Sequence, residues 1–467
     1  MPNKLRLRSN WFCAAVIGLL TVASGCILFS RSAGLNYKSA EVGARLATGS
    51  PQLVSVEPLS ASDGAMCEWT PASAHSSLFE VFQQGLPGAG TSERPGPSAR
   101  DDVARRKPVR VIHDPYAGYS AIAVDNRNNE VVMTDETLFQ VLAYDRLANT
   151  PPSATMTEPK RVIGGLKTEM EFQCGLYIDP NNGDIYAING DTVEQAVVFS
   201  RQAKGDVPPD RKFITPHGTA GIVVDEARQE LYLTVQHTHA VVVYRKMAKD
   251  DEAPVRLLQG ERTQLADPHG IAIDFKNDLM YVTNYGTLHQ TQPNKDGKSG
   301  KPNWPLERPV PGSGEMRPAS ITVYRRDASG DTAPLRVMQG PKTQLDWPAG
   351  LAFHPERNEL YVANDMGNDI LVFDASASGD VAPIRVLKGP KTLIQSPSGL
   401  YLDLKNNELW VANFGNHTAT VYAPTASGDT PPLRTIRSAP LGTPAPMLGN
   451  AHPLAYDTKR DEILVPN

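Results

Sequence analysis

The chain has 467 residues, more than one ordinary domain, so several domains or an array of repeats are expected. Its net charge of −5 is small for this length, which excludes the basic surface that nucleic-acid-binding proteins carry. Proline (39 residues) and glycine (37 residues) are both frequent, as in chains with many tight turns.

The first 29 residues have the pattern of an export signal. Lys4, Arg6 and Arg8 precede an uncharged run over residues 11–29. The run contains Val-Ala-Ser-Gly-Cys, ending at Cys26, which resembles a bacterial lipobox. The resemblance implies a lipidated Cys26 that anchors the N-terminus in a membrane. An uncleaved membrane anchor and a soluble secreted form are the alternatives, and all three place the body outside the cytoplasm, on the periplasmic side or at the cell surface.

Residues 30–76 are rich in Ser, Ala, Gly and Pro and show no sustained period, so we interpret them as a mostly irregular tether. Cys67 lies in this tether and Cys174 lies in the region that follows it. In an oxidising compartment the two can form a disulfide. A buried thiol at Cys174 is the alternative.

From residue 77 onward the chain repeats a unit of four short strands. The clearest copy runs from Ala349 to Gly389, where apolar and polar residues alternate in three segments and a fourth follows a proline. Short turns between strands make neighbouring strands antiparallel. Each copy ends its third strand with an aromatic residue and opens its fourth with Pro-x-Arg, which suits an exposed sheet edge. A period of about fifty residues with four strands per unit is typical of a β-propeller.

The units number six complete copies and two halves. The complete copies run from Ser120 to Ser438. The halves are the predicted strands Leu78–Phe82 and Val109–Ile112 before them, and Leu454–Asp457 and Glu462–Val465 after them. Joining the halves would leave no free sheet edge. We therefore predict an all-β, seven-bladed propeller over residues 77–467, closed by a composite blade from the N- and C-terminal segments.

Short motifs in the strands carry a resemblance to known repeats. Tyr281–Asn284 reads Tyr-Val-Thr-Asn, residues 361–364 and 410–413 are close variants, and Gly270–Asp274 reads Gly-Ile-Ala-Ile-Asp. These segments resemble the repeats of YVTN and NHL propellers. The resemblance implies the propeller fold, but it names no function, because such propellers host ligand binding, scaffolding and several chemistries.

Most histidines fall on one predicted face. They occur before first strands or in the loops from second to third strands, and both positions share one end of an antiparallel blade: His113, His217, His269 and His452 before first strands, and His237, His239, His289 and His417 in loops. At the mouth of the central channel, one position per unit carries Ser120, Cys174, Ala220, His269, Ala349, Ser398 and His452. Histidine is the commonest metal ligand and a base near neutral pH, so we expect this face to bind a ligand.

The motif Pro-His-Gly occurs at residues 216–218 and 268–270. It is similar to strand openings of the streptogramin lyases and the peptidyl-hydroxyglycine amidating lyases. The resemblance implies that His269 and His452, with His217 as a third, hold one divalent metal ion or act as bases in the channel.

Residues 287–319 form an insertion on the same face. It carries Trp304 and Arg308, which could cover a ligand; a solvated flap is the alternative.

Three functions follow from these patterns. The first is a membrane-tethered module whose histidine-rich face binds a protein, a peptide, a glycan or a small molecule. The second is a metal-dependent lyase or lactonase that uses the channel histidines. The third is a structural envelope protein. The sequence has no serine nucleophile elbow, phosphate-binding loop or Cys-x-x-Cys motif that would favour other chemistry.

Overall fold

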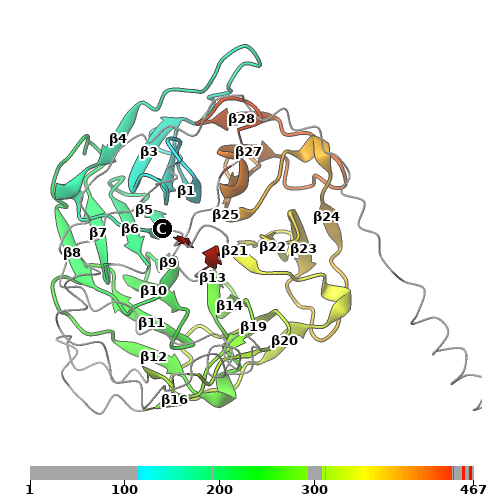
Figure 1. The fold of residues 1–467 in the computed structure, drawn as a ribbon. Helices are drawn as coiled ribbons and strands as arrows, with labels where there is room; N and C mark the ends of the chain where they lie inside the picture. The colour runs from blue at the N-terminus through cyan, green and yellow to red at the C-terminus, as the bar shows by residue number, and fades with distance from the viewer. Residues whose placement is uncertain are drawn as a thin grey trace, which may run out of the picture. The chain divides into compact units, whose positions relative to one another are not determined.

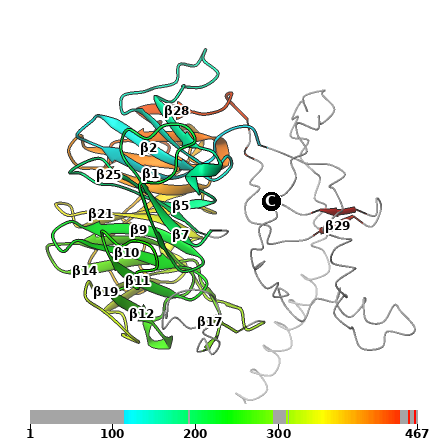
Figure 2. The same ribbon diagram turned by 90° about the vertical axis from the view of Figure 1, so that its left-hand side faces the viewer.

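The computed structural model describes residues 114–190, 193–292, 308–310, 312–443, 445, 455–457 and 462–464. Six four-stranded antiparallel sheets make up most of this part of the chain (Figure 1). We number them blades 1 to 6 in chain order. Within each blade the strands lie side by side in sequence order, and the first strand is the innermost. Seen edge-on in Figure 2, the strands run along the direction of the channel.

The strands of each blade have the following bounds. Blade 1 has β1 (Tyr119–Asp125), β2 (Glu130–Asp135), β3 (Gln140–Asp145) and β4 (Arg161–Gly164). Blade 2 has β5 (Gln173–Ile178), β6 (Ile185–Asn189), β7 (Gln195–Phe199) and β8 (Arg211–Ile214). Blade 3 has β9 (Thr219–Asp225), β10 (Glu230–Val235), β11 (Ala240–Arg245) and β12 (Arg256–Gln259). Blade 4 has β13 (Pro268–Asp274), β14 (Leu279–Asn284), β19 (Ser320–Arg325) and β20 (Arg336–Gln339). Blade 5 has β21 (Pro348–His354), β22 (Glu359–Asn364), β23 (Asp369–Asp374) and β24 (Arg385–Leu387). Blade 6 has β25 (Pro397–Asp403), β26 (Glu408–Asn413), β27 (Thr418–Tyr422) and β28 (Arg434–Arg437).

The core lies in the seams between neighbouring blades. Six buried apolar clusters each combine residues of two adjacent blades. The aromatic residue near the end of every third strand is buried in one of them: Tyr144, Phe199, Tyr244, Tyr324, Phe373 and Tyr422. Burying one large side chain contributes roughly 2–3 kcal/mol, so the repeated aromatic explains why the blades stay together.

The prediction of seven blades was wrong. Blade 1 packs directly on blade 6, because Tyr119 and Val131 share a buried cluster with Trp410. The backbone N–H of Thr150 also donates to the Thr435 carbonyl (2.7 Å). This seam closes the ring and leaves no place for a further blade. Counting half-units could not reveal it, because closure depends on how blades pack rather than on the number of strands left over.

The segments assigned to a composite blade do not form one in the described residues. β29 (Ala455–Asp457) and β30 (Glu462–Leu464) pair only with each other. The predicted strands Leu78–Phe82 and Val109–Ile112 lie outside the described residues. The part of the chain that the structure describes contains no helix that is long and apolar enough to cross a membrane.

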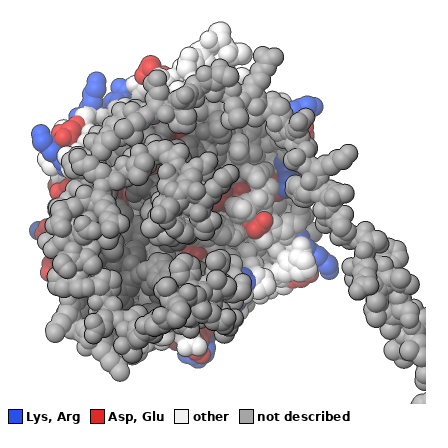
Figure 3. Space-filling model, viewed as in Figure 1, with Lys and Arg blue, Asp and Glu red and all other residues white. Residues whose placement is uncertain are grey.

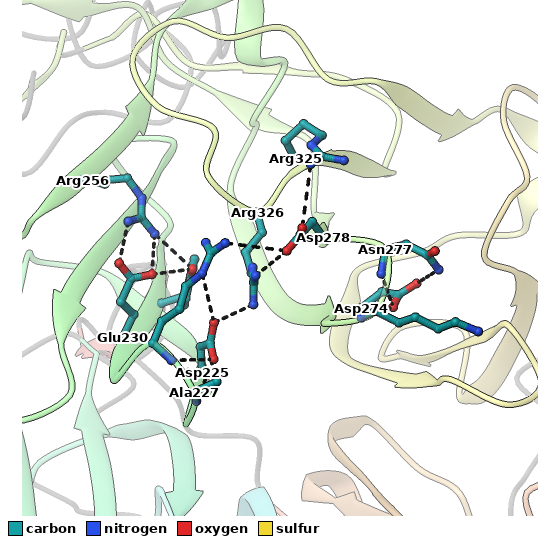
Figure 4. A network of polar contacts seen from close by, with 12 residues as sticks. Asp225, Ala227, Glu230, Arg256, Asp274, Asn277, Asp278, Arg325 and Arg326 are labelled. Carbon is teal, nitrogen blue, oxygen red and sulfur yellow. Dashed lines mark hydrogen bonds and ion pairs between the residues drawn. The ribbon is translucent and has the colours of Figure 1, made fainter.

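An aspartate at or just after the end of the first strand caps a turn in every blade except blade 5, which has His354 there, and in blades 1 to 3 it also joins two blades. Asp225 accepts hydrogen bonds from the backbone N–H groups of Ala227 (3.0 Å) and Arg228 (3.1 Å). Its other oxygen lies 2.6 Å from Arg326 of blade 4, which also pairs with Asp278 (Figure 4).

Corresponding basic residues bridge other seams. Lys246 pairs with Asp179 at 2.6 Å, and Arg201 pairs with Asp125 at 3.5 Å. At the next two seams, between blades 4 and 5 and between blades 5 and 6, the position of the basic residue holds Ala375 and Pro424. These two seams therefore lack the ion pair that the earlier ones share at this position.

The arginine of Pro-x-Arg, expected from its outer-strand position to protect a sheet edge, also makes contacts within its own blade. In blades 3 and 5 it reaches inward to the glutamate that opens the second strand, with Arg256 pairing with Glu230 (2.7 Å) and Arg385 with Glu359 (2.7 Å). Each guanidinium also lies over the ring of the tyrosine two residues further on, Tyr232 or Tyr361. The motif thus ties the fourth strand to the second within a blade.

Candidate functional site

One backbone hydrogen bond recurs in all six blades and defines equivalent positions around the channel. In each blade, the residue directly after the second strand donates its backbone N–H to the carbonyl of the residue directly before the first strand. The pairs are Glu136–Gly118 (3.2 Å), Gly190–Phe172 (2.9 Å), Gln236–Gly218 (2.8 Å), Tyr285–Asp267 (3.0 Å), Asp365–Trp347 (3.1 Å) and Phe414–Ser396 (3.1 Å). We call these residues, together with the predicted positions Ser120, Cys174, Ala220, His269, Ala349 and Ser398, the mouth positions. The inner strands that carry them surround the centre of Figure 1.

The two serines among the predicted site residues hold neighbouring inner strands together. Ser120 Oγ donates to the Gln173 carbonyl at 2.8 Å, which links blades 1 and 2. Ser398 Oγ donates to the Ser120 carbonyl at 2.8 Å, which links blades 6 and 1. Both hydroxyls are therefore engaged by the scaffold.

His269 is held at the mouth by three neighbours. Its ring stacks on Tyr285, with ring centroids 3.4 Å apart and planes 8° from parallel. Its Nε2 lies 3.3 Å from Asp267 Oδ1, and its Nδ1 lies 3.4 Å from Gln236 Nε2. Burial opposes ionisation of Asp267, but the contact with His269 and the nearby His237 outweigh it and keep the pKa of Asp267 below its usual value. The arrangement is an oriented imidazole–carboxylate pair.

The aromatic stack continues from blade 4 to blade 5. Trp347 lies 5.0 Å from Tyr285, ring centroid to ring centroid, with planes 31° apart. Its side chain remains 45% exposed and its φ is +52°, a left-handed conformation that a large residue rarely adopts. Burial raises the pKa of Tyr285 well above its usual value, so its hydroxyl keeps its proton. A half-exposed indole in such a place can contact a ligand.

Four other predicted histidines form two stacked pairs on blades 3 and 4. His239 stacks on His289 (centroids 5.7 Å apart), and His217 stacks on His237 (5.0 Å). The backbone N–H groups of Asp267 and His289 point at the ring nitrogens of His239, at 3.1 and 2.8 Å. Burial and the neighbouring His289 lower the pKa of His239 to about 4, so it is neutral at physiological pH.

His417 has a different role. It is fully buried in blade 6, with its Nδ1 2.9 Å from the Ala117 carbonyl and its Nε2 3.2 Å from Asp114 Oδ2. These contacts hold the segment before β1 against blade 6. A side chain with no exposed surface cannot contact a ligand directly.

Two acidic residues at the mouth escaped the sequence analysis. Burial, with the charges of Asp135 and Asp365, raises the pKa of Glu136 to about 8, although contacts with Cys174 and Ser120 oppose the rise. Burial likewise raises the pKa of Asp365 to about 6. The available signal was position: each acid directly follows the second strand, as Tyr285 does after Tyr-Val-Thr-Asn. The search for histidines passed over that position.

The described residues alone do not make up a metal centre. Among them, no group of three or more His, Cys, Asp and Glu side chains is arranged to hold a metal ion. His217 packs against His237, whereas His269 is bound to Asp267 and Tyr285. The third expected ligand, His452, lies outside the described residues, so its part in a site remains a prediction.

Several further predictions fall on residues that the structure does not describe. These are Cys26, Cys67, His113 and Trp304. The 287–319 insertion is described at its two ends, where β15 (Thr287–Leu288) pairs with β18 (Glu315–Met316) and β16 (Thr291–Gln292) pairs with β17 (Arg308–Pro309). Where described residues are visible in Figure 3, basic and acidic side chains are interspersed around the rim.

One family model matches more than half of the chain. Residues 176–431 match the family model described as SMP-30/Gluconolactonase/LRE-like region. Hydrazine synthase from Kuenenia stuttgartiensis is a structural neighbour at 12% identity and a TM-score of 0.44, covering 68% of this chain and 98% of that chain. A chain of a nidogen/laminin complex is another, at 14% identity and a TM-score of 0.40, covering 69% and 92%. No curated protein matches the chain. The fold and the family model agree with the expected YVTN/NHL type of propeller.

Proposed function

Since the chain belongs to the SMP-30/gluconolactonase/LRE-like family, we propose that it is an exported, membrane-tethered propeller that binds a small ligand at the mouth of its channel. The observation that carries this proposal is the recurring hydrogen bond between second and first strands. It fixes Glu136, Tyr285 and Asp365 at equivalent points of blades 1, 4 and 5. Sites built on rigid strands hold their side chains ready for a ligand before it arrives.

The charge states of these groups favour a polar ligand. Glu136, with a pKa of about 8, is mostly protonated at pH 7 and can donate a hydrogen bond. Asp365, with a pKa of about 6, is mostly ionised and accepts hydrogen bonds. The phenol of Tyr285 adds a group that both donates and accepts. A ligand with hydroxyl, carbonyl or amine groups would match this set.

The second candidate is hydrolysis of a lactone at the same place, which the His269–Asp267 pair favours. With Nε2 directed at Asp267, Nδ1 of His269 is the nitrogen left to take a proton from an attacking water molecule, which would replace the 3.4 Å contact with the Gln236 amide. Asp267 would orient the ring and stabilise its protonated form. The water oxygen would bond to the lactone carbonyl carbon, the ring C–O bond would break, and the leaving oxygen would recover the proton. This is the kind of chemistry that the family name suggests.

Binding and hydrolysis can be measured on the same full-length protein. Isothermal titration with D-glucono-1,5-lactone, its open-chain sugar alcohol, and small alkylammonium salts tests binding in the wild type, Glu136→Gln and Tyr285→Ala. Saturable binding of any class that the variants weaken while remaining folded supports the proposal. If no class binds, or if binding is unchanged in both variants, the protein is not a ligand-binding module at this mouth.

Lactone hydrolysis is followed at constant pH by base uptake. Activity lost in His269→Ala and retained in folded His354→Ala, a histidine at the end of β21 away from the mouth, would establish the enzyme. Binding with no hydrolysis above the buffer rate would exclude it. A purely structural envelope protein would show neither ligand binding nor lactone hydrolysis.

A further inference from the structure

The aromatic stack at the mouth ends in a surface that no described residue covers fully. His269, Tyr285 and Trp347 stack in that order, and Trp347 is the exposed end. Tyr285 lies on one side of the indole, and the 45% exposure shows that much of the remainder is open to solvent. A rigid indole supported from behind is a ready contact surface for one ligand group.

Two aspartates adjoin Trp347, one through the chain and one through a backbone hydrogen bond. Asp346 precedes Trp347 in the chain and is exposed, and the backbone N–H of Asp365 donates to the Trp347 carbonyl at 3.1 Å. Burial raises the pKa of Asp365 to about 6, the Ser396 hydrogen bond and the charge of His269 oppose the rise, and the charge of Asp346 adds to it. Oδ1 of Asp365 is buried and accepts no hydrogen bond from the described residues.

The rest of the mouth adds no compensating cation. None of the mouth positions carries Lys or Arg; Glu136 and Asp267 are acidic, and His269 is the basic group. His269 lies at the far end of the stack from the open indole face and is paired with Asp267, although its charge also lowers the pKa of Asp365. The charged residues nearest to Trp347 in the chain and in its backbone hydrogen bonding are therefore acidic.

An exposed indole next to carboxylates is suited to a positively charged organic group. The face of a tryptophan attracts a cation through its quadrupole, and carboxylates add charge attraction and hydrogen-bond acceptors. A small hard metal ion would need several oxygen ligands instead, and the described residues hold no such group. A neutral sugar could stack on the indole but would leave the two carboxylates repelling each other.

We infer that the mouth between blades 4 and 5 binds the ammonium group of an organic amine or quaternary ammonium compound, with Trp347 as the platform and Asp365 and Asp346 as counter-charges. The inference rests on the proposed function and names its ligand class. A secreted propeller with this site would recognise its ligand by charge and by the alkyl groups around the nitrogen.

The test is isothermal titration calorimetry of the full chain with choline and with methylammonium at neutral pH. The neutral compound 3,3-dimethylbutan-1-ol has the shape of choline without its charge and is the matched ligand control. Trp347→Ala and Asp365→Asn remove the platform and one counter-charge. Phe275→Ala and Asp327→Asn are matched protein controls, because both are exposed residues away from the mouth positions. Thermal melting of each variant verifies folding.

We expect the wild type to bind at least one of the two cations, and the affinity to fall at least about fivefold in Trp347→Ala and in Asp365→Asn. The control variants should bind as the wild type does, added salt should weaken binding, and the neutral analogue should bind at least about tenfold less tightly. Any of three results would overturn the inference: no saturable binding of either cation, equal binding of the neutral analogue, or unchanged affinity in folded Trp347→Ala.

The same measurements separate the inference from the proposed function. Saturable binding of the sugar lactone or sugar alcohol that depends on Tyr285, with no binding of either cation, would overturn the ligand class and leave the binding function intact. Absence of binding by every class would overturn both.

Discussion

Removing Arg326 should destabilise the ring far more than removing an exposed arginine. Its guanidinium bridges Asp225 of blade 3 and Asp278 of its own blade, and the side chains of Arg326 and Asp225 are 10% and 1% exposed (Figure 4). In Arg326→Ala the Asp225 carboxylate stays buried and keeps only the longer contact with Arg228, whose Nε lies 3.9 Å from Asp225 Oδ2. Breaking a buried pair on one side costs about 3–5 kcal/mol. Asp225 still accepts two backbone hydrogen bonds, so we expect a loss near ~3 kcal/mol, at the low end of that range.

The assay is urea unfolding followed by circular dichroism, with Arg245→Ala as the control. Arg245 pairs with Glu252 at 2.5 Å but is 68% exposed, so solvent screens the pair and its loss should change the stability little. Asp225→Asn combined with Arg326→Met removes both charges and should recover part of the loss. The reasoning fails if Arg326→Ala loses no more stability than Arg245→Ala, or if the double variant is less stable than the sum of its single changes predicts.

Three further predictions concern the mouth, a turn and the N-terminus. Because the pKa of Glu136 is raised to about 8 in the folded protein, folding is favoured by its proton at low pH, and this stabilisation is lost as the pH rises from about 4.5 through 8. The stability of the wild type relative to Glu136→Gln should therefore fall across that window, and a flat difference in urea midpoints would contradict the pKa. Gln344 is exposed and has φ +60°, so Gln344→Gly should raise the unfolding free energy by up to about 1 kcal/mol; a lower melting temperature would refute this. Cys26→Ser should abolish lipid labelling and release the protein from membranes; retention in the membrane fraction would instead favour the uncleaved anchor.

The repeated strands could be predicted because their signal is local. Alternation within strands, turn residues and the buried aromatic of each third strand are all visible over one unit, and these features are confirmed. The number of blades could not be obtained in this way. It depends on the seam where Tyr119 meets Trp410, and those residues are far apart in the chain.

The candidate site was predictable only in part for the same reason. His269 was found because its position at the start of a first strand is marked by Pro-His-Gly. Asp365 and Trp347 belong to no recognisable motif. Their role became visible only in the structure, where they are hydrogen-bonded to each other and Trp347 contacts Tyr285 of the preceding blade. The inward reach of Arg256 was hidden likewise, because the partner Glu230 lies two strands away within the blade.

The seam between blades 4 and 5, one of the two that lack the ion pair of the earlier seams, lies next to the proposed ligand site. Blades 4 and 5 meet there without the charged bridge that Arg326 supplies one seam earlier, and the same two blades carry Tyr285 and Trp347. A ligand that contacts both blades would link them in place of the missing ion pair. A ligand that binds only the folded state stabilises that state by mass action. A bound ligand at the mouth would therefore oppose separation of blades 4 and 5. Ligand binding at the mouth would thus raise the unfolding free energy of the propeller.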